Sequence, residues 1–121
     1  ERTYNAKINR LSNSMTNLAE VLASPGYVEF DSYVESVANR LKAADVPEEK
    51  VNQFEQDAYE AATYLHKAQR ELWQGLKELE NGNPRGAIKH YRVAVKNLKD
   101  FKESITPVVK EFEKMKERVS Q

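Results

Sequence analysis

The sequence ELENGNPRGAIKHY, residues 78–91, decides the fold of this chain. Glycine is the residue that most readily follows the end of a helix, and Gly82 occupies that place. Asn83 is a preferred helix cap, and Pro84 is suited to the first position of a new helix. The segment therefore predicts two helices joined by a tight turn, which makes them an antiparallel hairpin.

The apolar residues on both sides of this turn recur at spacings of three and four, which is the period of one helix face. Before the turn the spacing predicts a helix over about 47–81, and after it a helix over about 84–119. Pro107 falls inside the second of these helices. Because the apolar phase continues through it, we expect a continuous helix with a kink near 107; a separate helix after Thr106 is the alternative.

Two shorter helices are predicted ahead of the hairpin, over about 3–23 and 27–44. Ser24-Pro25-Gly26 separates them, because proline cannot continue the hydrogen-bond ladder of a helix. Short turns make neighbouring helices antiparallel. We therefore expect residues 1–121 to form a single all-α domain, an antiparallel (up-down-up-down) four-helix bundle with a long hairpin of the third and fourth helices. An open array of helices is the alternative.

The predicted helices differ in length, and this difference has a consequence for function. The hairpin helices are about 35 residues or 50 Å long, against about 20 residues or 30 Å for the first two. Residues around 68–98 should then project as a two-helix arm, unless the first two helices slide along the hairpin or it bends at Gly75. Exposed apolar patches usually mark a partner, so we expect a protein interface here, most simply that of a homodimer. The candidate interface residues are Leu72, Trp73, Leu76, Leu79, Ile88, Tyr91 and Val95.

The composition excludes several classes of function. The 19 basic and 19 acidic residues balance, so the whole chain has no bulk attraction to nucleic acid or to an anionic membrane. No apolar run approaches the roughly 20 residues of a transmembrane helix, so we expect no membrane span. The absence of cysteine excludes disulfides and thiolate chemistry. The sequence begins at Glu1 rather than at a methionine, so we expect either a product processed on export or a fragment cut at a domain edge, and we favour export.

A basic stripe follows the turn. Its members recur at spacings of four and three and are Arg85, Lys89, Arg92, Lys96 and Lys99. The preceding helix is acidic, with eight acids against four bases over residues 46–82. These charges predict that the two helices pair through their flanks. The alternative is that the stripe binds an anion, such as an acidic partner helix, lipid headgroups or an RNA backbone; a nucleic acid is not favoured, because interleaved aromatic residues are missing.

No combination of residues predicts catalysis. His66 and His90 are the only histidines, and neither belongs to a pair with the spacing of metal ligands, so we expect no metal. No nucleophile lies near a base, and no glycine-rich loop resembles a phosphate cradle. A haem would need a histidine late in the fourth helix, and residues 99–121 contain none. We expect no cofactor and no enzymatic activity.

Residues 71–98, ELWQGLKELENGNPRGAIKHYRVAVKNL, resemble a single tetratricopeptide hairpin. The matching small and aromatic positions are Gly75, Gly82, Ala87, Tyr91 and Ala94. The chain departs from that motif at Trp73, which is out of register, and at Pro84, where an aromatic residue is usual, and it contains no second copy. The resemblance implies protein binding through helices. We therefore expect a non-enzymatic interaction or structural module, for which the exported domain of a small surface protein is one setting.

Overall fold

The structure, a computed structural model, describes residues 2–120, and it contains no strand among the residues it describes. The helices follow one another as α1 (Arg2–Leu22), α2 (Pro25–Val28), α3 (Phe30–Ala43), α4 (Glu48–Glu80) and α5 (Pro84–Ser120). The predicted all-α class is confirmed. No helix in the described part of the chain combines the length and apolar character needed to cross a membrane.

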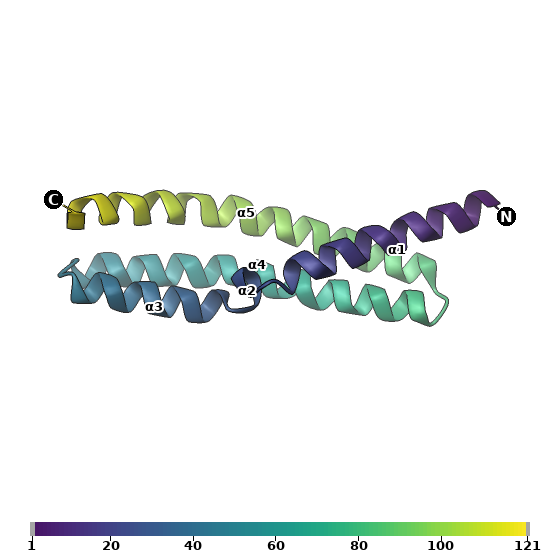
Figure 1. Cartoon of the computed structure of the whole chain (residues 1–121), viewed down its shortest axis with the longest axis horizontal. Helices are drawn as coiled ribbons and strands as arrows, with labels where there is room; N and C mark the ends of the chain where they lie inside the picture. The colour runs from purple at the N-terminus through teal and green to yellow at the C-terminus, as the bar shows by residue number, and fades with distance from the viewer. Residues whose placement is uncertain (1, 121) are drawn as a thin grey trace.

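The hairpin of α4 and α5 extends along most of the molecule, and the N-terminal end of α1 projects past its turn (Figure 1). Its turn uses the predicted residues: Gly82 has a φ of 79°, and the Gly86 N–H donates a hydrogen bond of 3.2 Å to Asn83 Oδ1. Small residues are frequent among the buried positions of both helices, and they allow a close approach where Gly75 faces the Ala87 carbonyl. These buried residues are Ala58, Ala61, Ala62, Ala68 and Gly75 on α4 and Ala87 and Ala94 on α5.

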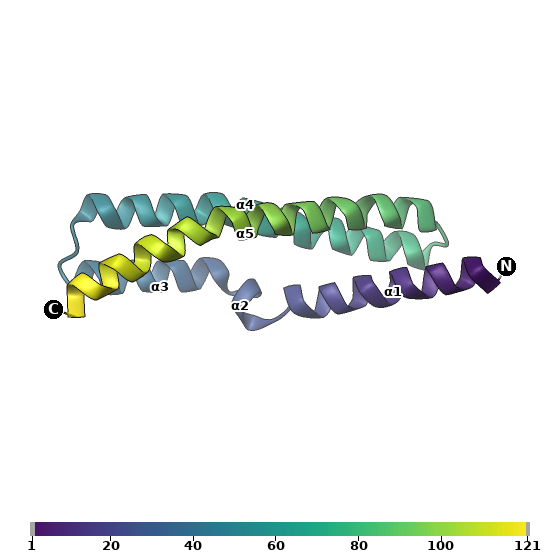
Figure 2. The same ribbon diagram turned by 90° about the horizontal axis from the view of Figure 1, so that it is seen from above.

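The first three helices are arranged differently from the prediction. α1 and α3 lie end to end along the hairpin, α1 beside the half that contains the α4–α5 turn and α3 beside the other half (Figures 1 and 2). The chain therefore runs in one direction through both helices, and α1 or α3 accompanies α4 and α5 along most of the hairpin (Figure 2). The predicted up-down-up-down order is corrected accordingly.

The hydrogen bonds between α1 and α3 explain why the chain does not reverse there. The Ser24 carbonyl accepts bonds from the Tyr27 and Val28 N–H groups, and the Glu29 carbonyl accepts one from Tyr33. A helical turn thus begins again directly after the break, with Pro25 at the first position of α2, where its missing N–H costs little. A second interruption, at Glu29, divides the helix predicted over 27–44 into α2 and α3, and the two interruptions together displace the helix axis without turning it back.

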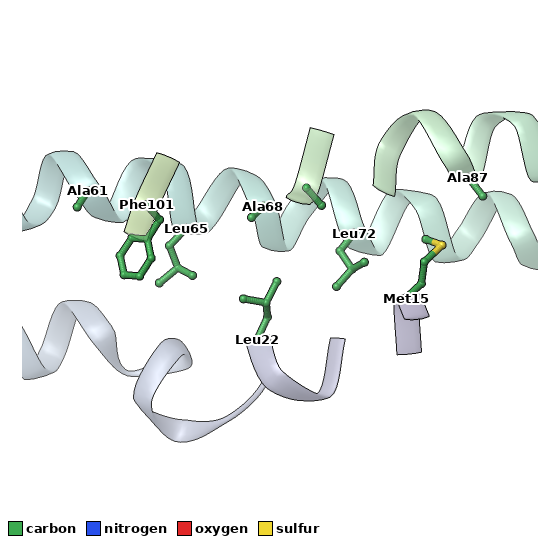
Figure 3. Packing of buried hydrophobic residues seen from close by; sticks show 9 residues of the cluster. Met15, Leu22, Ala61, Leu65, Ala68, Leu72, Ala87 and Phe101 are labelled. Carbon is green, nitrogen blue, oxygen red and sulfur yellow. The ribbon is translucent and has the colours of Figure 1, made fainter. Parts of the chain in front are cut away.

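Because α1 lies beside the turn-proximal half of the hairpin, the predicted two-helix arm does not exist. Met15 and Leu22 of α1 are buried and point towards α4 and α5, near Ala87 and Leu72 (Figure 3). A second core cluster fills the half of the molecule beside α3. Phe30 and Ile105 pack against both clusters, so the core is continuous along the long axis.

α5 continues through Pro107 as one helix, as expected, and it curves along its length (Figure 2). Proline removes one backbone donor from the helix. The Thr106 hydroxyl donates a hydrogen bond of 2.7 Å to the Lys102 carbonyl in the turn that precedes this position. A separate helix after Thr106 is therefore not formed.

Candidate interaction surfaces

The seven predicted interface residues do not form one surface. Leu72 is buried, and three others are half-buried against the core: Leu76, Leu79 and Tyr91. The remaining three, Trp73, Ile88 and Val95, are exposed over 64%, 36% and 42% of their surface. Trp73 lies on α4, whereas Ile88 and Val95 lie on α5, seven residues and therefore two turns apart. Helical spacing alone does not separate the covered members from the exposed ones.

Trp73 lines a hollow of about 400 Å³ between α4 and the end of α1 with α2. Val28, on the opposite wall, is exposed over 60% of its surface. The other lining residues are Ala19, Leu22, Ala23, His66, Gln69, Leu72 and Leu76. We call this cavity the Trp73 hollow; its wall is mainly apolar, with His66 and Gln69 as its polar members.

The two polar members of the Trp73 hollow are held by other helices. Gln69 Nε2 donates a hydrogen bond of 3.0 Å to the Leu22 carbonyl, which is one of the last in α1. His66 Nε2 lies 3.0 Å from Asp31 Oδ2 of α3. These contacts fix the rim of the hollow from two sides. Sequence analysis did not identify them, because residues 35 and 47 positions apart are brought together only by the in-line packing of α1 and α3.

The basic stripe is exposed along its whole length. Its five members, Arg85, Lys89, Arg92, Lys96 and Lys99, all face solvent. Among the described residues none of the five forms an ion pair with a carboxylate. The prediction that α4 and α5 pair through these charges is therefore wrong. A side-chain hydrogen bond does join the two helices: His90 Nδ1 lies 2.7 Å from Glu71 Oε2.

A second hollow, of about 560 Å³, lies between α4 and α5 in the other half of the molecule. Asp57 and Glu60 of α4 and Glu111 of α5 line it, with Lys50 as the single cation. Its remaining lining residues are Gln53, Phe54, Ser104, Pro107 and Val108. We call it the acidic hollow. Sequence analysis missed it, because Glu111 and Asp57 belong to segments that meet only through the hairpin.

Acidic residues also gather on the side of α4 that faces α3. Burial, together with the carboxylates of Glu55, Glu35 and Asp31, raises the pKa of the Tyr59 hydroxyl above its ordinary value. Loss of solvation is the largest cause of this shift, and the negative field of the three carboxylates, which destabilises the phenolate, adds to it. The α3 half of the molecule is thus acidic on two faces.

No group of three potential metal ligands comes together within the described part of the chain. His66 and His90 each pair with a carboxylate on another helix, at the edge of the core. The chain matches no known protein family, no curated protein and no solved structure among those with which it was compared. The candidate surfaces therefore have to be interpreted from their own chemistry.

Proposed function

We propose that this domain is a non-enzymatic protein-binding module that holds its partner at the Trp73 hollow. The observation that carries the proposal is the exposure of Trp73, 64% of its surface, on the wall of a mainly apolar hollow. Exposing a large aromatic side chain to water is unfavourable, and tryptophan is enriched among the residues that dominate binding energy at protein interfaces.

The shape and polarity of the hollow indicate what it binds. A volume of about 400 Å³ accommodates one or two bulky apolar side chains. Both ring nitrogens of His66 already have partners, Asp31 and Gln69, so the rim offers the second amide hydrogen of Gln69 for a hydrogen bond to the partner. We therefore expect an anchor residue such as leucine, phenylalanine or tryptophan on the partner, flanked by a polar group.

Selection of short random peptides against the immobilised domain should yield sequences that share one bulky apolar anchor. Their binding should change the fluorescence of Trp73 directly, because it is the single tryptophan of the chain. Replacing Trp73 with serine should weaken the selected peptides by about 30-fold or more, the scale expected for a dominant interface residue. Isothermal titration calorimetry of both proteins measures this difference.

Tyr33→Ser is the matched control, because Tyr33 is exposed to the same extent as Trp73 but lies on α3, outside the Trp73 hollow. This variant should bind the peptides as the unmodified chain does. Peptides without a common anchor, or equal binding by the Trp73→Ser variant, would contradict the proposal.

A second candidate function is anion binding by the basic stripe. It is favoured by the lack of ion-pair partners for the five side chains among the described residues.

A single-stranded oligonucleotide is a suitable probe of anion binding by the stripe. Its affinity should fall with rising salt, with a log–log slope no steeper than about −3.5 if all five cations contact phosphates. Lys89→Glu/Lys96→Glu should remove the binding in a gel-shift assay at low ionic strength; unchanged binding by this variant would exclude the stripe as the site.

A further inference from the structure

Lys89 and Lys96, two of the five members of the basic stripe, lie on the same side of α5 as Pro107, a lining residue of the acidic hollow. Pro107, which lines the acidic hollow, is eighteen residues or five full turns from Lys89, and eleven residues or about three turns from Lys96. α1 and α3 lie along one side of the hairpin (Figure 2). Because the acidic hollow is lined by α4 and α5 alone, we place its opening on the side that α1 and α3 leave uncovered. We call this side the open face.

The two halves of the molecule carry opposite charge. The half formed by residues 2–24 and 65–102 has 12 basic and five acidic residues. The half formed by residues 25–64 and 103–120 has seven basic and 13 acidic residues. The neutral chain is therefore an elongated dipole, with the basic stripe near one end of the open face and the acidic hollow near the other.

We propose that the open face binds a second copy of this chain in antiparallel orientation, with the basic stripe of each copy against the acidic hollow of the other. This inference rests on the second candidate function and names the acidic ligand of the stripe. Reversing one dipole against the other brings both pairs of opposite charges together at once. The interface is then isologous and closed, which is the commonest arrangement of soluble homo-oligomers.

The spacing along α5 is compatible with this arrangement. The stripe is centred near Arg92 and the acidic hollow near Val108, sixteen residues or about 24 Å apart. A two-fold axis near residue 100 of α5 therefore places the basic stripe of each copy opposite the acidic hollow of the other. The long side chains of Lys89 and Lys96 reach into a hollow of about 560 Å³ that offers the carboxylates of Asp57, Glu60 and Glu111.

Reversing the charge of the basic stripe or of the acidic hollow, one at a time, tests this pairing. Lys89→Glu/Lys96→Glu leaves the open face with acidic residues at both sites, and Glu60→Lys/Glu111→Lys leaves it with basic residues at both sites. All four positions are exposed. Sedimentation equilibrium at low ionic strength should show a mass of two chains for the unmodified protein and of one chain for each variant alone. The dissociation constant should rise by about a hundredfold, since symmetry places each reversed charge in the interface twice.

Mixing the two variants is the decisive step, because each then meets an open face of the opposite charge. The equimolar mixture should recover a mass of two chains and lose it as salt is added. Arg10→Glu/Arg40→Glu is the control: both positions are exposed, on α1 and α3, and the change in net charge equals that of the first variant. This control should remain a dimer.

Three results would overturn the inference: a single-chain mass for the unmodified protein, a mixture that stays at one chain, or dissociation of the control. If the unmodified protein is monomeric but binds the oligonucleotide through the stripe, the inference fails and the second candidate function stands. If it neither dimerises nor binds the oligonucleotide, both fail.

Discussion

Replacing Gly75 with leucine should lower the free energy of unfolding by about 2–3 kcal/mol, the upper part of the range for overpacking a core. Gly75 lies where α1, α4 and α5 meet. A Cβ atom at this position would come within 2.5 Å of Met15 Cε, 3.2 Å of His90 Cβ and 3.4 Å of the Ala87 carbonyl oxygen. Met15 can move aside, but the atoms of α5 cannot, so a larger side chain must separate the helices. Urea unfolding followed by circular dichroism measures the loss.

Gly26→Leu is the matched control, because a Cβ at Gly26 has no neighbouring atom within 4 Å. This substitution should leave stability within about 0.5 kcal/mol of the unmodified chain, as is usual for surface positions. Equal losses for the two variants would show that the effect comes from helix propensity or the unfolded state rather than from the crossing of three helices.

Replacing Met15 with alanine should cost about 3 kcal/mol, within the range measured for truncating buried methionine or leucine. Met15 is fully buried and is the main residue by which α1 contacts the hairpin near Ala87. Its removal should loosen α1 in particular. Hydrogen exchange should therefore accelerate in the α1 amides more than in α3, measured by mass spectrometry of peptic fragments.

Met115→Ala provides the comparison, since Met115 is equally apolar and buried but belongs to the core cluster beside α3. It should lower the free energy of unfolding by a similar amount and leave the hydrogen exchange of α1 at its original level.

The combination of Met15→Ala with Gly75→Leu should lower the free energy of unfolding by less than the sum of the two single changes, because the space vacated by the Met15 side chain receives the new leucine. Faster exchange of α1 in the Met115 variant, or additive losses, would contradict the proposed role of Met15.

Local signals predicted the hairpin correctly because its turn is stabilised by near neighbours. The Asn83 cap, the positive φ of Gly82 and the first position of Pro84 all act within a few residues. The path between α1 and α3 was predicted incorrectly, because Pro25 ends one helix without specifying the direction of the next. That direction depends on where the apolar faces of α1 and α3 are buried, which is a property of the whole hairpin.

For the candidate surfaces too, features that depend on near neighbours were predicted from the sequence, whereas contacts between helices were not. The basic stripe was found from sequence, since its spacing places its members on one helix face whatever the surroundings. Whether the acidic residues of α4 form ion pairs with the stripe could not be predicted from sequence. Such pairs form only if the relative register of α4 and α5 brings the carboxylates close to the cations. Trp73 was chosen for its apolar character together with Leu72, one position away; the packing of α1 separates the two by covering only Leu72.

The sequence by itself determined the helical class, the central hairpin and the five exposed cations, because periodicity, capping and turn chemistry act over a few residues. Only the tertiary structure decided that α1 and α3 lie in line, that α1 covers the expected arm, and that a Trp73 hollow and an acidic hollow open on different sides. The physical reason is that burial and charge pairing between helices depend on their relative register and direction. Those quantities are set by the sum of many weak contacts distant in the chain, and no single segment encodes them.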